Sequence, residues 1–172
     1  MKMMRYVGIF LAFVGVAFAG MLLMAPSEVA FQVNEDINAP ISEVYDAITN
    51  HNKMAKWING VESTKQTKGD GCAVGSEYDL FFQGDGGMVL NHKVNTAETN
   101  KMYAYTGTVK DFFKMTSVTE FEALDSATTR IQSKVTMEPL SNKFKLFMYA
   151  KDTHIKNAKD NYTRLQYFLA KN

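Results

Sequence analysis

An uncharged apolar run from Val7 to Met24 follows two basic residues, Lys2 and Arg5, at the start of the chain. A helix rises by about 1.5 Å per residue, so a helix of this length spans roughly 27 Å, close to the thickness of the hydrocarbon core of a bilayer. The run has no polar face at helical spacing, which argues against a buried helix of a soluble domain. Residues 1–26 are therefore predicted to direct the chain to a membrane or to export.

Two interpretations of this segment stay open. In the first it is a secretory signal peptide, in which Ala17, Phe18 and Ala19 form a small-x-small cleavage site and the domain is released as a secreted or periplasmic protein. In the second it is an uncleaved signal anchor, because the apolar run continues past Ala19 and ends only at Pro26. We favour the anchor, a single transmembrane helix, since cleavage after Ala19 would leave a strongly apolar first segment on the mature chain.

The distribution of basic residues predicts how such an anchor is oriented. Lys2 and Arg5 precede the apolar run, and the next basic residue after it is Lys53. The cytoplasmic flanks of membrane spans carry the excess of Lys and Arg. We therefore expect a single-pass membrane protein with its N-terminus in the cytoplasm and residues 27–172 on the non-cytoplasmic side.

The composition of residues 27–172 narrows the classes of partner. Removing Lys2 and Arg5 from the 19 basic residues leaves 17 against 18 acidic ones, a formal charge of −1, so the domain has no general attraction for nucleic acid. The single cysteine, Cys72, excludes an internal disulfide and a zinc site built from several cysteines. No spacing of His, Cys and carboxylate residues indicates a metal, and we expect no cofactor.

Apolar residues in residues 27–172 recur at helical spacing near both ends and at every second position between them. Residues 109–116 are left unassigned. A curved antiparallel β-sheet wrapped around a long C-terminal helix covers every apolar face, so the predicted fold class is α+β. The predicted strands are 28–37, 61–68, 76–82, 88–98, 102–108, 117–124 and 128–138, and the predicted helices are 41–48, 52–57 and 142–169.

Five groups of short motifs are distributed over this region. They are 37–48 (INAPISEVYDAI), 54–57 (MAKW), 74–78 (VGSEY), 121–124 with 128–131 (FEAL and TTRI) and 157–165 (NAKDNYTRL). Together they resemble the SRPBCC superfamily of START-related, helix-grip domains, which includes polyketide cyclase/dehydrase-like proteins and membrane-tethered members. The chain departs from the family pattern at Glu35–Asp36, where Arg-Ser is common, and at Ser126–Ala127, where a Gly often makes the turn.

The resemblance implies a helix-grip fold with an apolar cavity between the sheet and the C-terminal helix. Members of the superfamily bind lipids, sterols, polyketides or hormones, and some of them catalyse cyclisation or dehydration. No motif in this chain selects one of these activities, and a shared fold does not by itself do so.

The candidate ligand contacts are aromatic and apolar side chains that the predicted elements turn toward such a cavity; the alternative is that they fill a core. Tyr103 and Tyr105 are the most suggestive pair, because both can point inward from one strand with their hydroxyls in an apolar space. His92 shares a face with apolar residues and is a candidate acid or base, although a histidine satisfied by a neighbouring group is the simpler interpretation. The full set is Trp57, Tyr78, Leu80, Phe82, Leu90, His92, Tyr103, Tyr105, Phe121, Met137, Phe147, Met148 and Ile155.

Other chemically capable residues are interpreted as structural. His51 lies between the two short helices and is expected to be solvated. Glu77 and Asp79 alternate with apolar residues, which predicts that they lie on the solvent side of their strand. Cys72 has no basic neighbour in the sequence that would activate its thiol. We therefore assign no catalytic residue.

Three functions are compatible with the sequence. The first is a membrane-anchored domain that binds a hydrophobic small molecule or lipid. The second is a polyketide cyclase or dehydratase-like enzyme with His92, Tyr103 or Tyr105 as proton carriers, which requires polar groups to converge in the cavity. The third is a non-catalytic envelope or stress protein that binds another protein, which requires a filled interior and an exposed apolar patch.

Overall fold

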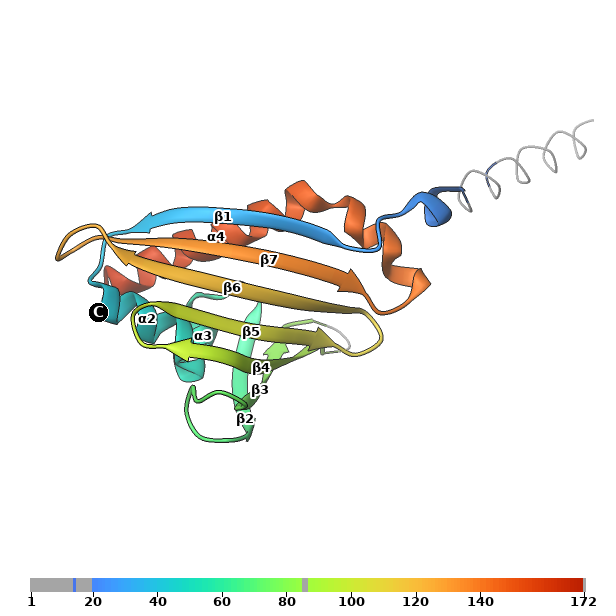
Figure 1. Cartoon of the computed structure of the whole chain (residues 1–172). Helices are drawn as coiled ribbons and strands as arrows, with labels where there is room; N and C mark the ends of the chain where they lie inside the picture. Colours follow the sequence, from blue (N-terminus) through green and yellow to red (C-terminus); the bar gives the residue numbers. More distant parts are fainter. Residues whose placement is uncertain (1–13, 15–19, 85–86, 172) are drawn as a thin grey trace, which may run out of the picture.

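The computed structural model describes residue 14 and residues 20–84 and 87–171, which form a seven-stranded sheet with helices packed on one face (Figure 1). The strands are β1 (Val29–Ile37), β2 (Val61–Lys68), β3 (Glu77–Phe82), β4 (Val89–Glu98), β5 (Met102–Val109), β6 (Phe113–Ala123) and β7 (Thr129–Pro139). The helices are α2 (Ile41–Thr49), α3 (His51–Trp57), the 3₁₀ helix η1 (Asn142–Tyr149) and α4 (Lys151–Leu169). The α+β helix-grip fold predicted from the sequence is confirmed.

The first and last strands of the chain are neighbours in the sheet. All neighbouring strands are antiparallel, in the order β1-β7-β6-β5-β4-β3-β2. Strands β2 to β7 follow one another directly, and β7 then pairs along the whole of β1. Arg130 Nε and Nη2 donate to the two carboxylate oxygens of Asp36 at 2.8 and 2.9 Å across this pair. After β7 the chain turns back over the sheet as η1 and α4 (Figure 1).

Two short helices, α2 and α3, contact β6 and β2 respectively. Pro40 precedes α2 with a φ of −57°, a backbone angle that suits the entry to a helix. Asn50 caps α3, since its side chain accepts a hydrogen bond of 3.1 Å from the Asn52 N–H. The Trp57 indole N–H donates to the Ala47 carbonyl at 2.9 Å, which holds the two helices together.

The predicted single helix over 142–169 is wrong in its first third. Residues Asn142–Tyr149 form a 3₁₀ helix, and the α-helix begins only at Lys151. In a 3₁₀ helix, residues three apart lie in line, and this places Phe144 and Phe147 together on the ring of Phe112, with centroid distances of 4.0 and 5.2 Å. The packing of these three aromatic rings accompanies a 3₁₀ helix in a segment whose apolar spacing predicts an α-helix.

The segment left unassigned, 109–116, is the turn between β5 and β6 and the first part of β6. Asp111 has a positive φ of 60°, a conformation that Asp tolerates better than most residues, and it reverses the chain. Strand β6 therefore begins at Phe113, four residues earlier than the predicted strand.

Most of the N-terminal apolar run lies outside the described residues. Residues 20–24 are helical, and the Tyr149 hydroxyl donates to the Met21 carbonyl at 3.3 Å. Within residues 14, 20–84 and 87–171, no helix combines the length and the apolar character that a membrane span requires. The predicted anchor stays a prediction.

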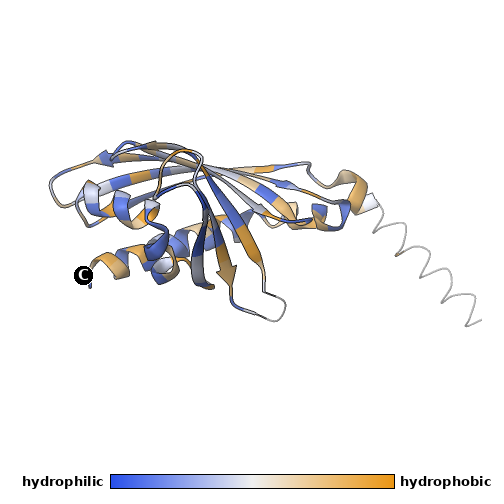
Figure 2. Cartoon of the chain, turned by 90° about the horizontal axis from the view of Figure 1, so that it is seen from below, coloured by the Kyte–Doolittle hydropathy of each residue, from blue (hydrophilic) through white to orange (hydrophobic). Residues whose placement is uncertain are grey.

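The core lies between the sheet and the helices, where apolar residues alternate with polar ones along the strands (Figure 2). Among the described residues, the buried apolar members of the core cluster run from Val29 to Leu165 and so lie within residues 27–172. Leu165 of α4 has no exposed surface, whereas Tyr167, two positions further along, is 66% exposed. Helix α4 thus docks through a narrow stripe of buried side chains.

We expect Leu165→Ala to lower the free energy of unfolding of residues 27–172 by about 2–5 kcal/mol, because it removes a fully buried side chain and leaves a cavity. The matched control, Tyr167→Ala on the exposed face of the same helix, should change it by less than about 0.5 kcal/mol. Urea unfolding followed by Trp57 fluorescence measures both. Equal losses in the two variants would contradict the docking of α4 through Leu165.

Candidate ligand cavity

A cavity of about 550 Å³ lies between the inner face of the sheet and helix α4. Side chains of β1, β3 to β7, α2, α3, η1 and α4 form its wall. Cavities that hold small molecules in proteins typically measure about 300–1,000 Å³ and are mostly apolar. The sheet and the helix therefore stand far enough apart to admit a guest of ordinary ligand size.

Nine of the thirteen candidate residues lie on the wall of this cavity. They come from α3, from strands β3, β4, β5 and β7, and from η1. They are Trp57, Leu80, Phe82, Leu90, His92, Tyr103, Tyr105, Met137 and Phe147. That they contact a ligand stays a prediction, but the structure brings them to one enclosed space.

The other four candidates do not line the cavity. Tyr78 stacks on His51 of α3 at a centroid distance of 4.5 Å, and its hydroxyl donates to the Gly71 carbonyl. Phe121 packs edge-on against Tyr45 of α2 at 5.3 Å. Both residues thus support the short helices. Met148 is buried in the core cluster, and Ile155 is half-buried outside the cavity wall.

Ile155 lies at the edge of the face of α4 that lines the cavity and does not itself contribute to the wall. The residues that line the cavity are spaced i, i+3, i+4, i+7 and i+8, one face of an α-helix. They are His154, Asn157, Ala158, Asn161 and Tyr162.

Several other wall residues are not among the candidates predicted from the sequence. Phe112, Phe113 and Met115 lie in the segment that had no assigned structure, although two adjacent phenylalanines signal burial. Ser117 and Thr119 lie on β6 and were taken for ordinary strand residues. Further contributions come from Phe31, Ile48, Met54, Ile58, Asn59, Met88 and Val135.

Two rows of side chains cross the inner face of the sheet because of the antiparallel register. Tyr103 of β5 pairs with Thr119 of β6, which pairs with Ser133 of β7. Two residues further along β5, Tyr105 pairs with Ser117 of β6. Residues directly opposite in an antiparallel pair have their side chains on the same face, close enough to interact. The register therefore collects hydroxyl groups at the centre of the sheet.

Two of these hydroxyls form a chain with a third, that of Tyr162 on α4. Thr119 Oγ1 and Ser133 Oγ lie 2.7 Å apart, and Ser133 Oγ lies 2.5 Å from the Tyr162 hydroxyl of α4. Thr119 and Ser133 are buried, and Thr119 and Tyr162 both face the cavity. Burial raises the pKa of Tyr162, so its hydroxyl stays protonated.

His92 belongs to a second polar group in the wall. Its Nε2 lies 2.8 Å from the Tyr103 hydroxyl, and its ring stacks on Tyr105 at a centroid distance of 3.9 Å. Burial lowers the pKa of His92 to about 3, which keeps the imidazole neutral at physiological pH. Burial also raises the pKa of the Tyr103 and Tyr105 hydroxyls. The interpretation of His92 as a satisfied buried histidine is supported, and it lines the cavity as well.

Exposed wall residues mark the mouth of the cavity. Asn59 after α3, Met88 before β4 and Asn157 on α4 line the cavity and are exposed to solvent. The Asn59 N–H donates to Asn161 Oδ1 at 2.9 Å, and this hydrogen bond connects the α3–β2 loop to α4 beside the opening.

A larger and more open groove of about 870 Å³ lies on the outside of α4, near its C-terminal end. Charged side chains line much of it, including Lys56, Asp160, Arg164 and Lys171. Such a groove leaves an apolar guest in contact with water, so burial contributes little to binding there. The interior cavity is the better candidate site despite its smaller volume.

Histidine and carboxylate residues away from the cavity have structural partners. The expectation that His51 is solvated is wrong: it is half-buried, it stacks on Tyr78, and burial lowers its pKa. Glu77 forms an ion pair with Lys68 at 3.6 Å, and Asp79 accepts a hydrogen bond of 3.2 Å from Asn91. Among the described residues, no group of three or more His, Cys, Asp or Glu side chains is placed to hold a metal ion.

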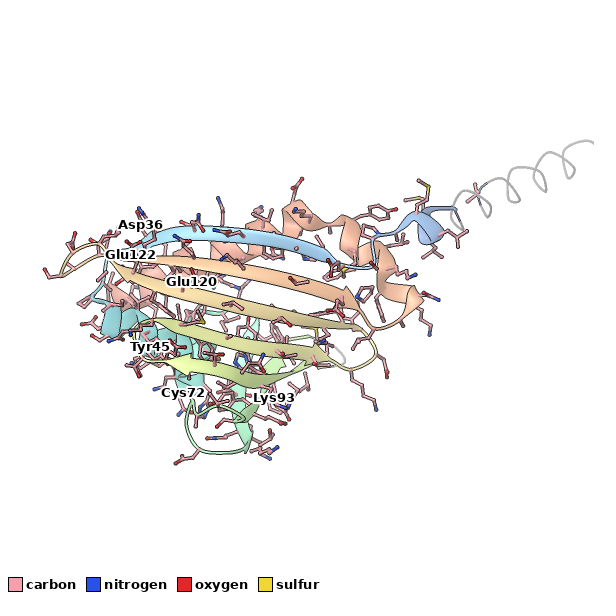
Figure 3. The ribbon with its side chains drawn as sticks, viewed as in Figure 1. Asp36, Tyr45, Cys72, Lys93, Glu120 and Glu122 are labelled. Atoms are coloured by element: carbon pink, nitrogen blue, oxygen red, sulfur yellow. The ribbon has the colours of Figure 1, made fainter. Side chains whose placement is uncertain are left out.

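Charged side chains of several strands lie on the outer face of the sheet, whereas Glu35 of β1 lies on the side of α4 and forms an ion pair of 4.0 Å with Lys159. Figure 3 labels Asp36, Glu120 and Glu122 on strands β1 and β6, on the side away from α4. Glu120 forms an ion pair of 3.7 Å with Lys134 across β6 and β7. The alternation of each strand thus separates a charged outer face from the inner face that bounds the cavity.

A curved antiparallel sheet that grips a C-terminal helix around an internal cavity defines the SRPBCC helix-grip class. The family model described as "Polyketide cyclase / dehydrase and lipid transport" matches residues 28–165. The chain therefore belongs to this family, whose members bind hydrophobic small molecules, and it is a ligand-binding or cyclase-like domain. No curated protein sequence gives a significant match.

Solved structures of similar shape support the fold. The Zhui aromatase/cyclase from Streptomyces sp. R1128 superimposes with a TM-score of 0.65 at 11% identity, covering 81% of this chain and 92% of its own. Major latex-like protein 151 from Panax ginseng gives a TM-score of 0.66 at 9% identity, covering 83% and 98%. An uncharacterised protein from Bacillus thuringiensis gives 0.62 at 18% identity, covering 81% and 97%. Likeness at these identities concerns the fold alone.

The buried His92 predicts a distinct dependence of stability on pH. The unfolded chain protonates this histidine near its ordinary pKa of 6.5, whereas the folded protein resists protonation down to about 3. Between these values the unfolded state binds more protons, so stability falls as the pH is lowered, by up to about 1.4 kcal/mol per pH unit from this residue.

His92→Gln should remove that contribution while retaining a polar partner for Tyr103. Urea unfolding of residues 27–172 from about pH 7 to about pH 4.5 should show a steeper loss of stability in the wild type than in the variant. Carboxylates and the other two histidines are common to both proteins and cancel in the difference. Parallel profiles would mean that His92 is not held neutral in the folded state.

Proposed function

We propose that residues 27–172 form a domain that binds a hydrophobic small molecule or lipid in the cavity between the sheet and α4. The observation that carries the proposal is the cavity itself, about 550 Å³ with a wall that is largely aromatic and aliphatic. Each 100 Å² of apolar ligand surface removed from water contributes about 2.5 kcal/mol before the costs of association are subtracted. A few polar groups in the wall then orient the guest.

Retention of the N-terminal segment as a membrane anchor is the second part of the proposal. The uncharged run up to Met24 supports it, as do the two basic residues before the run. Large apolar side chains are also exposed where this segment joins the domain: Leu23 is 86%, Met24 82% and Tyr149 50% exposed. Side chains of this kind suit the interface of a bilayer. An anchor would keep the cavity close to membrane lipid, on the non-cytoplasmic side.

A cyclase or dehydratase-like activity is the alternative, and convergence of polar groups in the cavity favours it. His92, Tyr103 and Tyr105 lie together on the wall, as an acid–base mechanism would need. Their protonation chemistry is unfavourable, however, because a catalytic acid or base works best with a pKa near the ambient pH. Burial moves the pKa of His92 down to about 3 and raises those of both tyrosines. Binding is therefore the better-supported function.

The interpretation as a protein-binding envelope or stress protein required a filled interior. The cavity of about 550 Å³ argues against that requirement. The exposed apolar residues next to the N-terminal segment are better explained by a membrane than by an unidentified protein partner, because they adjoin the predicted anchor.

Native mass spectrometry of residues 27–172, purified without detergent, tests the binding function. We expect a co-purifying apolar ligand, or one that exchanges into the domain when offered. Ala158→Phe should abolish this binding because the new ring occupies space in the cavity, and Ala127→Phe, in an exposed turn, should leave it unchanged. Absence of any apolar ligand from the folded wild-type domain would refute the proposal.

The anchor is tested on the full chain expressed in cells. The intact mass of the membrane-extracted protein should include residues 1–26. A Ser126→Cys variant in a Cys72→Ser background places one thiol in an exposed turn, and a membrane-impermeant maleimide should label it in intact cells. A mature chain that begins at Gly20, or a thiol protected until the cells are broken, would contradict retention or orientation respectively.

A further inference from the structure

The cavity wall is formed by uncharged side chains. None of the described residues that line it is Asp, Glu, Lys or Arg. Glu120 and Lys134 form an ion pair on the outer face of the sheet, and Glu35 of β1 forms an ion pair with Lys159 of α4 outside the cavity wall. No carboxylate, ammonium or guanidinium group of the described wall could therefore neutralise a charged guest.

Histidine and tyrosine are the ionisable residue types that do line the wall. Burial keeps His92, Tyr105 and Tyr162 uncharged. His92 is 3% exposed and is satisfied by the Tyr103 hydroxyl, and burial lowers its pKa to about 3. The pKa values of Tyr105 and Tyr162 are raised by burial. His154 contacts the Phe147 carbonyl through Nε2 at 3.0 Å, so that nitrogen is committed to the backbone. A charged head group in this space would lose its hydration without gaining a counter-charge.

The hydroxyl chain, by contrast, can bind a neutral polar group. Thr119, Ser133 and Tyr162 carry three hydroxyl protons, and the two contacts at 2.7 and 2.5 Å use two of them. One proton is left, and it can be presented at either end of the chain because hydroxyl protons reorient. Both ends, Thr119 and Tyr162, face the cavity. The chain thus offers one donor and free acceptor lone pairs to a guest.

We propose that the cavity selects uncharged amphiphiles, in which an apolar chain or ring system carries a hydroxyl, carbonyl or ester group, and rejects the same apolar body with an anionic head. The polar group of the guest bonds to the hydroxyl chain at Tyr162 or Thr119, and the apolar body lies along the aromatic wall. This inference rests on the proposed binding function and adds the chemical class of the ligand. Neither the family match nor the similar structures supply that selectivity.

Photo-crosslinking of the full chain in phosphatidylcholine vesicles provides the test. The two probes are a long-chain alcohol with a diazirine and an alkyne on its chain, and the sulfate ester of the same alcohol, which is ionised at every working pH. Yields at peptides of the cavity wall are measured by mass spectrometry and normalised to the amount of each probe in the membrane. We expect the normalised crosslinking yield of the alcohol to exceed that of the sulfate by about tenfold or more, because the charged head group would lose its hydration in the cavity.

Removal of one hydroxyl from the hydroxyl chain should selectively lower the crosslinking of the alcohol probe. Tyr162→Phe should lower the cavity crosslinking of the alcohol by about three- to tenfold, as expected for one lost hydrogen bond, and leave the weak sulfate signal unchanged. Tyr167→Phe makes the same chemical change on the exposed side of α4 and should have no effect. Thr119→Val removes the other end of the chain and replaces Tyr162→Phe if that variant fails to fold.

The outcomes distinguish a failure of the proposed binding function from a failure of the proposed selectivity. No cavity crosslink with either probe would refute the proposed binding function. Equal yields for the two probes, or a preference for the sulfate, would overturn the selectivity while leaving binding intact. A preference for the alcohol that is unaffected by both Tyr162→Phe and Thr119→Val would overturn the role of the hydroxyl chain.

Discussion

Antiparallel pairing of β5, β6 and β7 sets the positions of the polar groups in the cavity. In this register Tyr103, Thr119 and Ser133 lie in one row across three strands, and Tyr105 lies opposite Ser117 in the next. A shift of one residue in β6 or β7 would turn the inner hydroxyls of that strand to the outer face and its charged side chains toward the cavity. The sheet register therefore places the hydroxyl rows of the interior, and α4 adds Tyr162, which joins the hydroxyl chain, and the polar wall residues His154, Asn157 and Asn161.

The polar groups of the wall are stable in an apolar space because they satisfy one another. His92 and Tyr103 share a hydrogen bond of 2.8 Å, and Ser133 lies between Thr119 and Tyr162. Burying a hydroxyl or an imidazole without a partner is costly, whereas a paired neutral group is tolerated. The pairing allows these groups to be buried, and burial in turn keeps them uncharged, by lowering the pKa of His92 and raising that of Tyr162. The proposed selectivity for neutral ligands rests on this burial of paired groups.

The fold could be predicted from the sequence because its local patterns agree with its tertiary structure. Alternation along 61–138 gave the strands, and the motif at 37–48 placed the helix after β1. The 3₁₀ helix Asn142–Tyr149 could not be predicted, because it depends on Phe112 packing against Phe144 and Phe147, a contact between distant segments. Tyr78 and Phe121 were placed in the cavity because alternation identifies the inner face of a strand but not what covers it at each point. Here α3 and α2 do so.

The break before α4 also helps to explain why the interior is hollow. The 3₁₀ turn holds Phe147 in contact with Phe112 and Phe113, so the aromatic cluster fills one end of the space between the sheet and the helix. At the other end Leu165 is fully buried. Between these two points the inner face of α4 carries Ala158 and two asparagines, together with Tyr162, which contacts Ser133 of β7. The small and polar side chains beside Tyr162 leave volume between the helix and the sheet, and this volume is the cavity.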